Sequence, residues 1–139
     1  METRLIVVAS AVLMAAVAGC SSQPSALGGT TAKVTIDGKS TGDAHVVKCS
    51  QTGWDWTIAT PDKGNGFTAV VQTGDTLTAE RVDFRDLGGF TGSFWSKNIG
   101  EAEVSGVNGK YTITGSADGN YTDKPSEAVT ATFRIEASC

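Results

Sequence analysis

The alternation of apolar and polar residues changes twice along the chain, and each change marks a different kind of segment. Residues 5–17 are almost continuously apolar, whereas residues 21–32 are rich in Ser, Thr, Gly and Pro and show no apolar period. From Lys33 to the end, β-branched and aromatic residues alternate with polar ones, and Gly, Asn, Asp or Pro interrupts the alternation roughly every eight to twelve residues. This pattern predicts strands that are buried on one face only.

Nine strands are expected in this last segment. They are placed at residues 33–37, 45–50, 54–59, 67–73, 76–84, 89–95, 102–107, 110–117 and 129–137, and residues 121–128 are expected to form a loop. No segment shows a convincing period of an amphipathic helix. The expected fold class is therefore all-β, a small antiparallel sandwich or partly open barrel of about eight or nine short strands.

The Asn-Gly pair at 108–109 predicts the surest hairpin, because both residues favour the positive φ of a two-residue type I′ turn. With this pair as the loop, Val107 lies opposite Lys110 and Val104 lies opposite Ile113. The predicted register places mostly polar residues on the outer face of the hairpin and apolar residues on the inner face.

The apolar run at residues 5–17 has the features of a signal peptide. Arg4 and the amino terminus give it a positive start, and it is shorter than the roughly 20 residues that a membrane-spanning helix needs. The residues at its end, Val-Ala-Gly-Cys at 17–20, resemble the bacterial lipobox, in which small residues precede an obligatory Cys. We therefore expect residues 1–19 to be a lipoprotein signal peptide that is removed, which leaves Cys20 as the new N-terminus.

Cys20 is the expected lipidation site. Its thiol takes up a diacylglyceryl group, and its new amino group takes up a further acyl chain such as palmitate. One acyl chain gives only marginal membrane binding, at about 0.8 kcal/mol per buried methylene, so the multiple chains decide the location. We expect the protein to be lipid-anchored to the cell membrane, on the extracytoplasmic face of the cell envelope. No other cofactor is expected.

The mature chain divides into a lipidated flexible tether at residues 20–32 and a single β domain at residues 33–139. Removal of residues 1–19 subtracts one acid, Glu2, and one base, Arg4, so the formal charge stays at −4. The remaining Lys and Arg residues are scattered without a run or a stripe. This distribution argues against nucleic acid as a partner.

Three cysteines would leave one unpaired in an exported protein, but lipidation of Cys20 leaves Cys49 and Cys139 as a pair. We expect a disulfide between these two residues. Metal binding or nucleophilic catalysis by them is disfavoured, because metal sites need clustered ligands and His45 is the only histidine in the chain. No metal site is expected.

The sequence offers no catalytic constellation. It contains no G-x-S-x-G nucleophile motif, and Glu101 and Glu103 share the polar face of a hairpin, as solubilising charges do. The glycine clusters at 64–66 and 87–89 do not open a helix, so they predict turns and no phosphate site. We therefore expect no enzymatic activity.

Aromatic residues concentrate in the middle of the chain. Trp54 and Trp56 fall on one strand face, and Phe90 and Trp95 belong to a second group around Gly92. Packing into the core is the favoured interpretation, because aromatic side chains dominate the buried area of small β domains. The alternative is that Trp54, Trp56, Phe90 and Trp95 line an exposed platform or pocket that stacks on a lipid or glycan of the envelope.

Four short blocks of the mature chain resemble the mycobacterial lipoprotein antigen family typified by LpqH. They are KVTIDGK at 33–39, VVKC at 46–49, KYTITGSA at 110–117 and FRIEASC at 133–139. The blocks span nearly the whole mature chain, and the two remaining cysteines fit the pattern. The tether is shorter than the mannosylated Ser/Thr-rich tether of family members, and the Trp-rich middle at 54–95 has no match in the family pattern.

The resemblance implies a cell-envelope lipoprotein whose surface is antigenic and whose acylated Cys20 is recognised by host innate receptors of the Toll-like type. It implies no catalytic residue. The expected function is that of a membrane-anchored surface antigen and interaction module. The alternative function is a carrier or binder of envelope lipid or glycan that uses an aromatic-lined pocket.

Overall fold

Eleven antiparallel strands form one sheet in the computed structural model, which describes residues 30–107 and 109–139. The strands are β1 (Thr31–Ile36), β2 (Lys39–Ser40), β3 (His45–Val46), β4 (Lys48–Thr52), β5 (Asp55–Ala59), β6 (Gly66–Gln72), β7 (Thr78–Leu87), β8 (Phe90–Trp95), β9 (Glu101–Val107), β10 (Lys110–Tyr121) and β11 (Lys124–Ser138). The expected signal peptide, Cys20 and the expected tether as far as residue 29 lie outside the described residues. Within the described ranges, no helix is long and apolar enough to cross a membrane.

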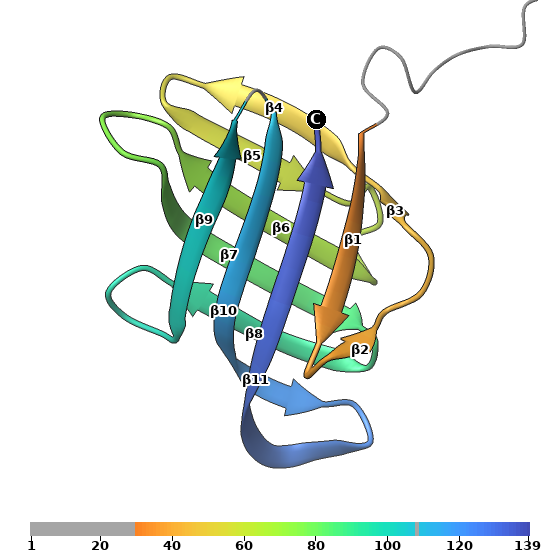
Figure 1. The fold of residues 1–139 in the computed structure, drawn as a ribbon. Helices are drawn as coiled ribbons and strands as arrows, with labels where there is room; N and C mark the ends of the chain where they lie inside the picture. Colours follow the sequence, from red (N-terminus) through yellow and green to blue (C-terminus); the bar gives the residue numbers. More distant parts are fainter. Residues whose placement is uncertain (1–29, 108) are drawn as a thin grey trace, which may run out of the picture.

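The sheet folds back on itself into two layers (Figure 1). In hydrogen-bonding order its path runs β2-β1-β11-β10-β8-β7-β6-β5-β4, with β3 beside β1 and β9 beside β10. In Figure 1, β9, β10, β11 and β1 form the nearer layer, and β4 to β8 cross behind it. The strand β10 joins the layers, because its first half pairs with β9 and its end pairs with β8. The two ends of this path do not pair within the described chain, so the sheet stays open. The described elements are all strands, which confirms the expected all-β fold class.

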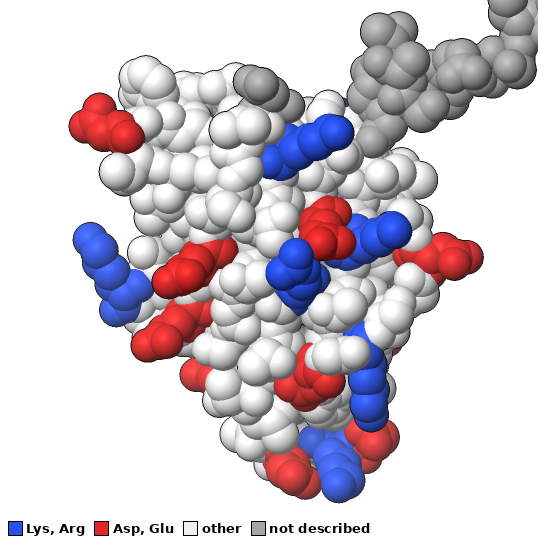
Figure 2. Space-filling model, viewed as in Figure 1, with Lys and Arg blue, Asp and Glu red and all other residues white. Residues whose placement is uncertain are grey.

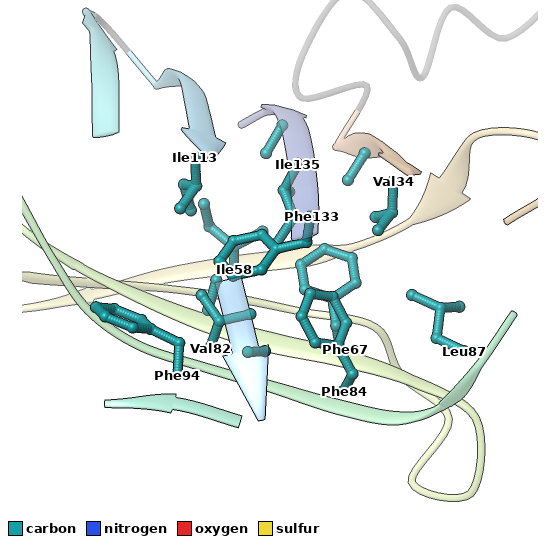
Figure 3. Close-up of a cluster of buried hydrophobic side chains, with 14 of the residues drawn as sticks. Val34, Ile58, Phe67, Val82, Phe84, Leu87, Phe94, Ile113, Phe133 and Ile135 are labelled. Atoms are coloured by element: carbon teal, nitrogen blue, oxygen red, sulfur yellow. The ribbon is translucent and has the colours of Figure 1, made fainter. Parts of the chain in front are cut away.

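The core fills the space between the two layers (Figure 3). The labelled side chains come from both layers and are Val34, Ile58, Phe67, Val82, Phe84, Leu87, Phe94, Ile113, Phe133 and Ile135. Phe84 in β7 and Phe133 in β11 bridge the layers in an edge-to-face arrangement, with ring centroids 5.2 Å apart. Burial of each such side chain stabilises the fold by about 1.5–3 kcal/mol.

Two sequence predictions are confirmed in the nearer layer. Every second residue of β11 from Ala131 to Ala137 is buried, and the residues between them are exposed. In the β9–β10 hairpin, Val104 pairs with Ile113, and the neighbouring pairs follow the predicted register. Hydrophobic alternation therefore determines which face of these strands covers the core.

The prediction of a loop at residues 121–128 is wrong. The strand β10 continues to Tyr121 and β11 begins at Lys124, so two residues form the turn of a long hairpin. Pro125 suggested a break, because proline has no N–H for a sheet ladder. It lies at the exposed end of this hairpin, where its carbonyl accepts a hydrogen bond of 2.7 Å from the side chain of Asn120.

The start of the domain also differs in detail from the expectation. The strand β1 begins at Thr31, two residues before the expected boundary at Lys33. The single strand expected at 45–50 is divided into β3 and β4 at Val47, whose N–H donates to the carbonyl of Thr30 at 2.9 Å. At this point the chain leaves its pairing with β1 and begins its pairing with β5. The strand β2 has only two residues, too few for alternation to reveal.

Candidate functional site

Two of the four aromatic residues proposed as a pocket belong to the core. Phe90 is fully buried, and its ring centroid lies 5.9 Å from that of Phe84. Trp56 is half-buried and packs against the core, with its ring centroid 6.1 Å from that of Tyr111. The core interpretation therefore holds for Phe90 and Trp56.

The other two aromatic residues lie outside the core. Trp54 is 68% exposed, so the expectation that it packs in the core is wrong. It precedes the first residue of β5, where strand pairing ends and alternation no longer decides burial. Trp95 is 43% exposed, and the guanidinium of Arg81 lies over its ring at 5.0 Å from the centroid. The structure therefore does not bring Trp54, Trp56, Phe90 and Trp95 together, and the aromatic-pocket alternative has no specific support.

The expected disulfide joins Cys49 to Cys139, with the two Cα atoms 5.9 Å apart. It links β4, at one edge of the sheet, to the residue that follows β11. The N–H of Cys139 also donates to the carbonyl of Gly109 at 2.7 Å. The C-terminus is thus fixed at the end of the molecule where Thr31 of β1 pairs with Ser138 of β11 (Figure 1).

Three turns meet at the opposite end of the two-layer sheet, which we call the distal end (Figure 1). They are the β1–β2 turn at 37–38, the β7–β8 turn at 88–89 and the β10–β11 turn at 122–123. Between these turns lies a groove of about 660 Å³, which we call the distal groove. Its lining includes the turn residues Asp37, Gly88, Gly89, Thr122 and Asp123, together with Lys39 and Thr41. The first two turns need left-handed backbone, which glycine adopts at little cost, and Gly88 and Gly89 have φ of 59° and 80°.

Asp37 fastens the β1–β2 turn to the β10–β11 hairpin. Its own backbone is left-handed, with φ of 50°. Its carboxylate accepts a hydrogen bond of 2.5 Å from the hydroxyl of Tyr121 and one of 3.0 Å from the backbone N–H of Thr132. The backbone N–H of Asp37 in turn donates to the carbonyl of Thr132 at 2.8 Å. These bonds close the distal end across the two neighbouring strands β1 and β11.

The bond between Asp37 and Tyr121 shifts the pKa of both groups. The Tyr121 hydroxyl, helped by the bonds from Thr132 and by the charge of Lys39, lowers the pKa of Asp37 against an opposing effect of burial. The same bond, burial and the charges of Asp37 and Asp123 raise the pKa of Tyr121 to about 12. Near neutral pH an ionised carboxylate therefore accepts a hydrogen bond from a protonated phenol.

The β10–β11 turn is also fastened to the β7–β8 turn. The N–H of Thr122 donates to the carbonyl of Gly89 at 2.8 Å, and its hydroxyl donates to the Asp86 carboxylate at 2.6 Å. A second hollow of about 350 Å³ continues past Tyr121 toward Lys124 and shares Tyr121 with the distal groove. The ring centroid of Tyr121 is 5.4 Å from that of buried Phe90. Tyr121 is thus held in place beside two open hollows, which also share Lys39 and Asp123.

Sequence patterns identify the turns of the distal groove but not the groove. The Asp-Gly pair at 37–38 and the Gly-Gly pair at 88–89 are recognisable turn signals. Asp37 and Tyr121, however, are separated by 84 residues, and no local pattern shows that they meet. The residues 121–128 also carried a loop signal, which hid the fact that Tyr121 ends a strand.

The remaining candidate chemistry is dispersed. His45 lies in β3, where its Nε2 is 2.9 Å from the hydroxyl of Thr41. In the described part of the chain, no group of three or more His, Cys, Asp or Glu side chains is placed to hold a metal ion.

Comparison with known proteins assigns the chain to a family. A family model described as Mycobacterium 19 kDa lipoprotein antigen matches residues 25–139. A lipoprotein of Mycobacterium indicus pranii is 38% identical over 135 residues, which cover 96% of each chain. The lipoprotein LppE of Mycobacterium tuberculosis is 34% identical over the whole of both chains, and LpqH of Mycobacterium bovis is 31% identical over 96% of this chain and 94% of its own. This chain therefore belongs to the Mycobacterium 19 kDa lipoprotein antigen family, and it is a lipoprotein of the mycobacterial cell envelope.

Proposed function

We propose that this lipoprotein is a non-catalytic surface antigen and interaction module, anchored on the extracytoplasmic face of the membrane and recognised by host Toll-like receptors through its acylated Cys20. The family match supports the proposal: it covers residues 25–139 of a lipoprotein antigen family, and the lipobox at 17–20 precedes it in the sequence. The relatives named above are lipoproteins, and a lipoprotein needs an acylated cysteine at its mature N-terminus.

The proposed division of the chain follows from this assignment. Residues 1–19 are a signal peptide that is removed, a lipidated tether begins at Cys20, and the β domain, expected from Lys33, begins with β1 at Thr31. Residues 20–30 can span at most roughly 35 Å when fully extended, at about 3.5 Å per residue. The anchor therefore keeps the domain close to the membrane surface. Its first strand, β1, starts at the same end of the domain as the disulfide.

The charge distribution on the surface of the domain argues against nucleic acid as a partner. Figure 2 shows Lys and Arg side chains interspersed with Asp and Glu side chains on the face of β9, β10, β11 and β1. The formal charge of the whole chain is −4, and this face has no basic stripe that would follow a phosphate backbone. These features favour protein partners over nucleic acid.

Receptor stimulation by matched variants tests the proposal. Full-length protein, Cys20→Ala and the control Ser21→Ala are purified from the same host and added in equal amounts to reporter cells that carry a Toll-like receptor. Full-length protein and Ser21→Ala should stimulate the cells equally, and Cys20→Ala should lose the response because it lacks the acyl chains. Equal stimulation by Cys20→Ala would show that recognition does not depend on the anchor.

A further inference from the structure

The distal groove is a fixed structure and not a gap between mobile loops. Each of its three turns is joined to a neighbour by hydrogen bonds, through Asp37 with Tyr121 and through Thr122 with Gly89 and Asp86. The volume of about 660 Å³ falls within the roughly 300–1,000 Å³ that small-molecule sites occupy. A ligand would therefore meet a preformed surface and would pay little to order it.

The chemistry of the groove combines one aromatic ring with many hydrogen-bonding groups. Tyr121 lines both hollows, and its side chain is partly exposed. Lys39 and Asp123 also line the groove and are exposed, whereas the hydroxyls of Ser40 and Thr41 already donate to the carbonyls of Gly42 and Val34. A sugar ring matches this set, because its hydroxyls both donate and accept hydrogen bonds and its C–H face packs on an aromatic ring.

The charges of the two hollows favour a neutral ligand over an anion. Asp37, Asp123 and Glu127 contribute three negative charges, whereas Lys39 and Lys124 contribute two positive ones. The ammonium of Lys124 lies 3.9 Å from the carboxylate of Glu127. A phosphate or carboxylate ligand would be repelled by the acidic excess. A neutral polyol can accept from the lysine and donate to the carboxylates.

The position of the groove leaves it accessible in an anchored protein. The groove lies at the distal end, whereas β1 begins and the disulfide lies at the opposite end (Figure 1). The domain would thus present the groove away from its point of attachment to the tether.

We propose that the distal groove binds a neutral oligosaccharide, with Tyr121 as the stacking surface and Lys39 and Asp123 as hydrogen-bonding groups. None of the four aromatic candidates lines this site, and the site needs no contribution from the acyl chains, so it goes beyond the antigen role proposed above. In this arrangement Asp37 is a positioning residue, because its carboxylate holds the Tyr121 hydroxyl.

An NMR titration of the full-length acylated lipoprotein tests the site. The ¹⁵N-labelled protein is kept in a detergent without a sugar headgroup and is titrated with the neutral trisaccharides maltotriose and mannotriose, and separately with glucose 6-phosphate. We expect at least one neutral trisaccharide to cause saturable shifts of the amide signals of Gly88, Gly89 and Asp123, with a Kd of about 1 mM or below.

Variants assign the effect to the groove. The double variant Lys39→Ala/Asp123→Ala removes two exposed side chains and should weaken binding about tenfold, because the ligand loses the hydrogen bonds that these side chains make. The control Lys110→Ala removes an exposed lysine at the other end of β10 and should bind as the parent does. The proposal is wrong if neither trisaccharide shifts the groove signals, if the double variant binds like the parent, or if glucose 6-phosphate binds there more tightly than both neutral sugars.

Discussion

At the scale of single residues, Asp37 shows how one side chain can determine the shape of a surface. A non-glycine residue in the left-handed region costs free energy, and Asp is among the few residues that tolerate it. The four hydrogen bonds that the backbone and carboxylate of Asp37 make with Tyr121 and Thr132 compensate for this cost. The distal groove therefore depends on a contact between residues that are far apart in the sequence.

Tyr121 predicts a pH dependence of stability. Its pKa is about 12 in the folded protein and about 10 in an unfolded chain. Between these two pH values the unfolded state loses a proton that the folded state keeps, so the free energy of unfolding falls as pH rises from about 10 to about 12. Urea unfolding across this range should show a smaller loss of stability in Tyr121→Phe than in the parent. Parallel losses in the two proteins would contradict the contact.

The stability of the protein at acid pH gives an independent check of the contact between Asp37 and Tyr121. The pKa of Asp37 is lowered in the folded protein, so its contribution to stability is present above the usual pKa of about 4 and is lost as pH falls below it. Asp37→Asn should therefore remove part of the acid sensitivity that the parent shows in the same unfolding experiment. The size of the effect is limited by the solvent exposure of Asp37.

Truncation of Trp54 and truncation of Trp56 should lower the free energy of unfolding by different amounts. Trp54 is largely exposed, so Trp54→Ala should change the free energy of unfolding by no more than about 0.5 kcal/mol. Trp56 packs against the core, so Trp56→Ala should cost about 2 kcal/mol, less than the roughly 3–5 kcal/mol of a fully buried aromatic residue. Thermal melts of both variants beside the parent measure the difference, and equal costs would contradict the placement of Trp54.

At the scale of elements, the strand β10 decides how the sheet folds into two layers. It contacts β9 through residues 110–116 and β8 through residues 118–121. Gly115 and Gly119 lie along this strand, where the backbones of β9 and β8 approach too closely for a side chain. Glycines at such corners allow a sheet to bend.

Gly115→Ala tests this role of β10. A Cβ atom at Gly115 would lie 2.0 Å from the carbonyl oxygen of Glu101 and 2.7 Å from the Cα of Ala102, so β9 would have to move. We expect a cost of about 2–3 kcal/mol and faster amide hydrogen exchange in β9. The control Gly74→Ala meets nothing within 4 Å and should change stability by no more than about 1 kcal/mol. Equal unfolding midpoints for the two variants would refute this explanation of the bend.

The elements also show which features a sequence can predict. The alternation in β11 and the Asn-Gly turn before β10 determine burial and register locally, so these predictions are confirmed. Pro125 suggested a loop, because proline has no N–H for a sheet ladder. The local pattern does not show that Tyr121, which pairs with Lys124, is held by Asp37 on a distant turn. The exposure of Trp54 likewise depends on where the pairing of β4 with β5 ends, because Trp54 lies in the turn between Thr52 and Asp55.

At the scale of the whole molecule, the disulfide between Cys49 and Cys139 joins the two layers at the tethered end. It closes a loop with a sequence separation of 90 residues, which the chain-entropy model values at about 4–5 kcal/mol. The double variant Cys49→Ser/Cys139→Ser should therefore lower the free energy of unfolding by several kcal/mol, as measured by urea denaturation. A midpoint equal to that of the parent would show that the disulfide does not stabilise the domain.

Among the described residues the core cluster runs from Ala32 to Cys139, and Cys20 lies outside the part of the chain that the structure describes. The central claim, that this domain is held in the envelope by acyl chains on Cys20, is tested most directly by mass spectrometry of protein extracted from membranes. We predict that the parent begins at Cys20 and carries a diacylglyceryl group and an acyl chain, whereas Cys20→Ala carries no lipid. A parent protein with an unmodified Cys20, or a Cys20→Ala variant that still carries lipid, would contradict the claim.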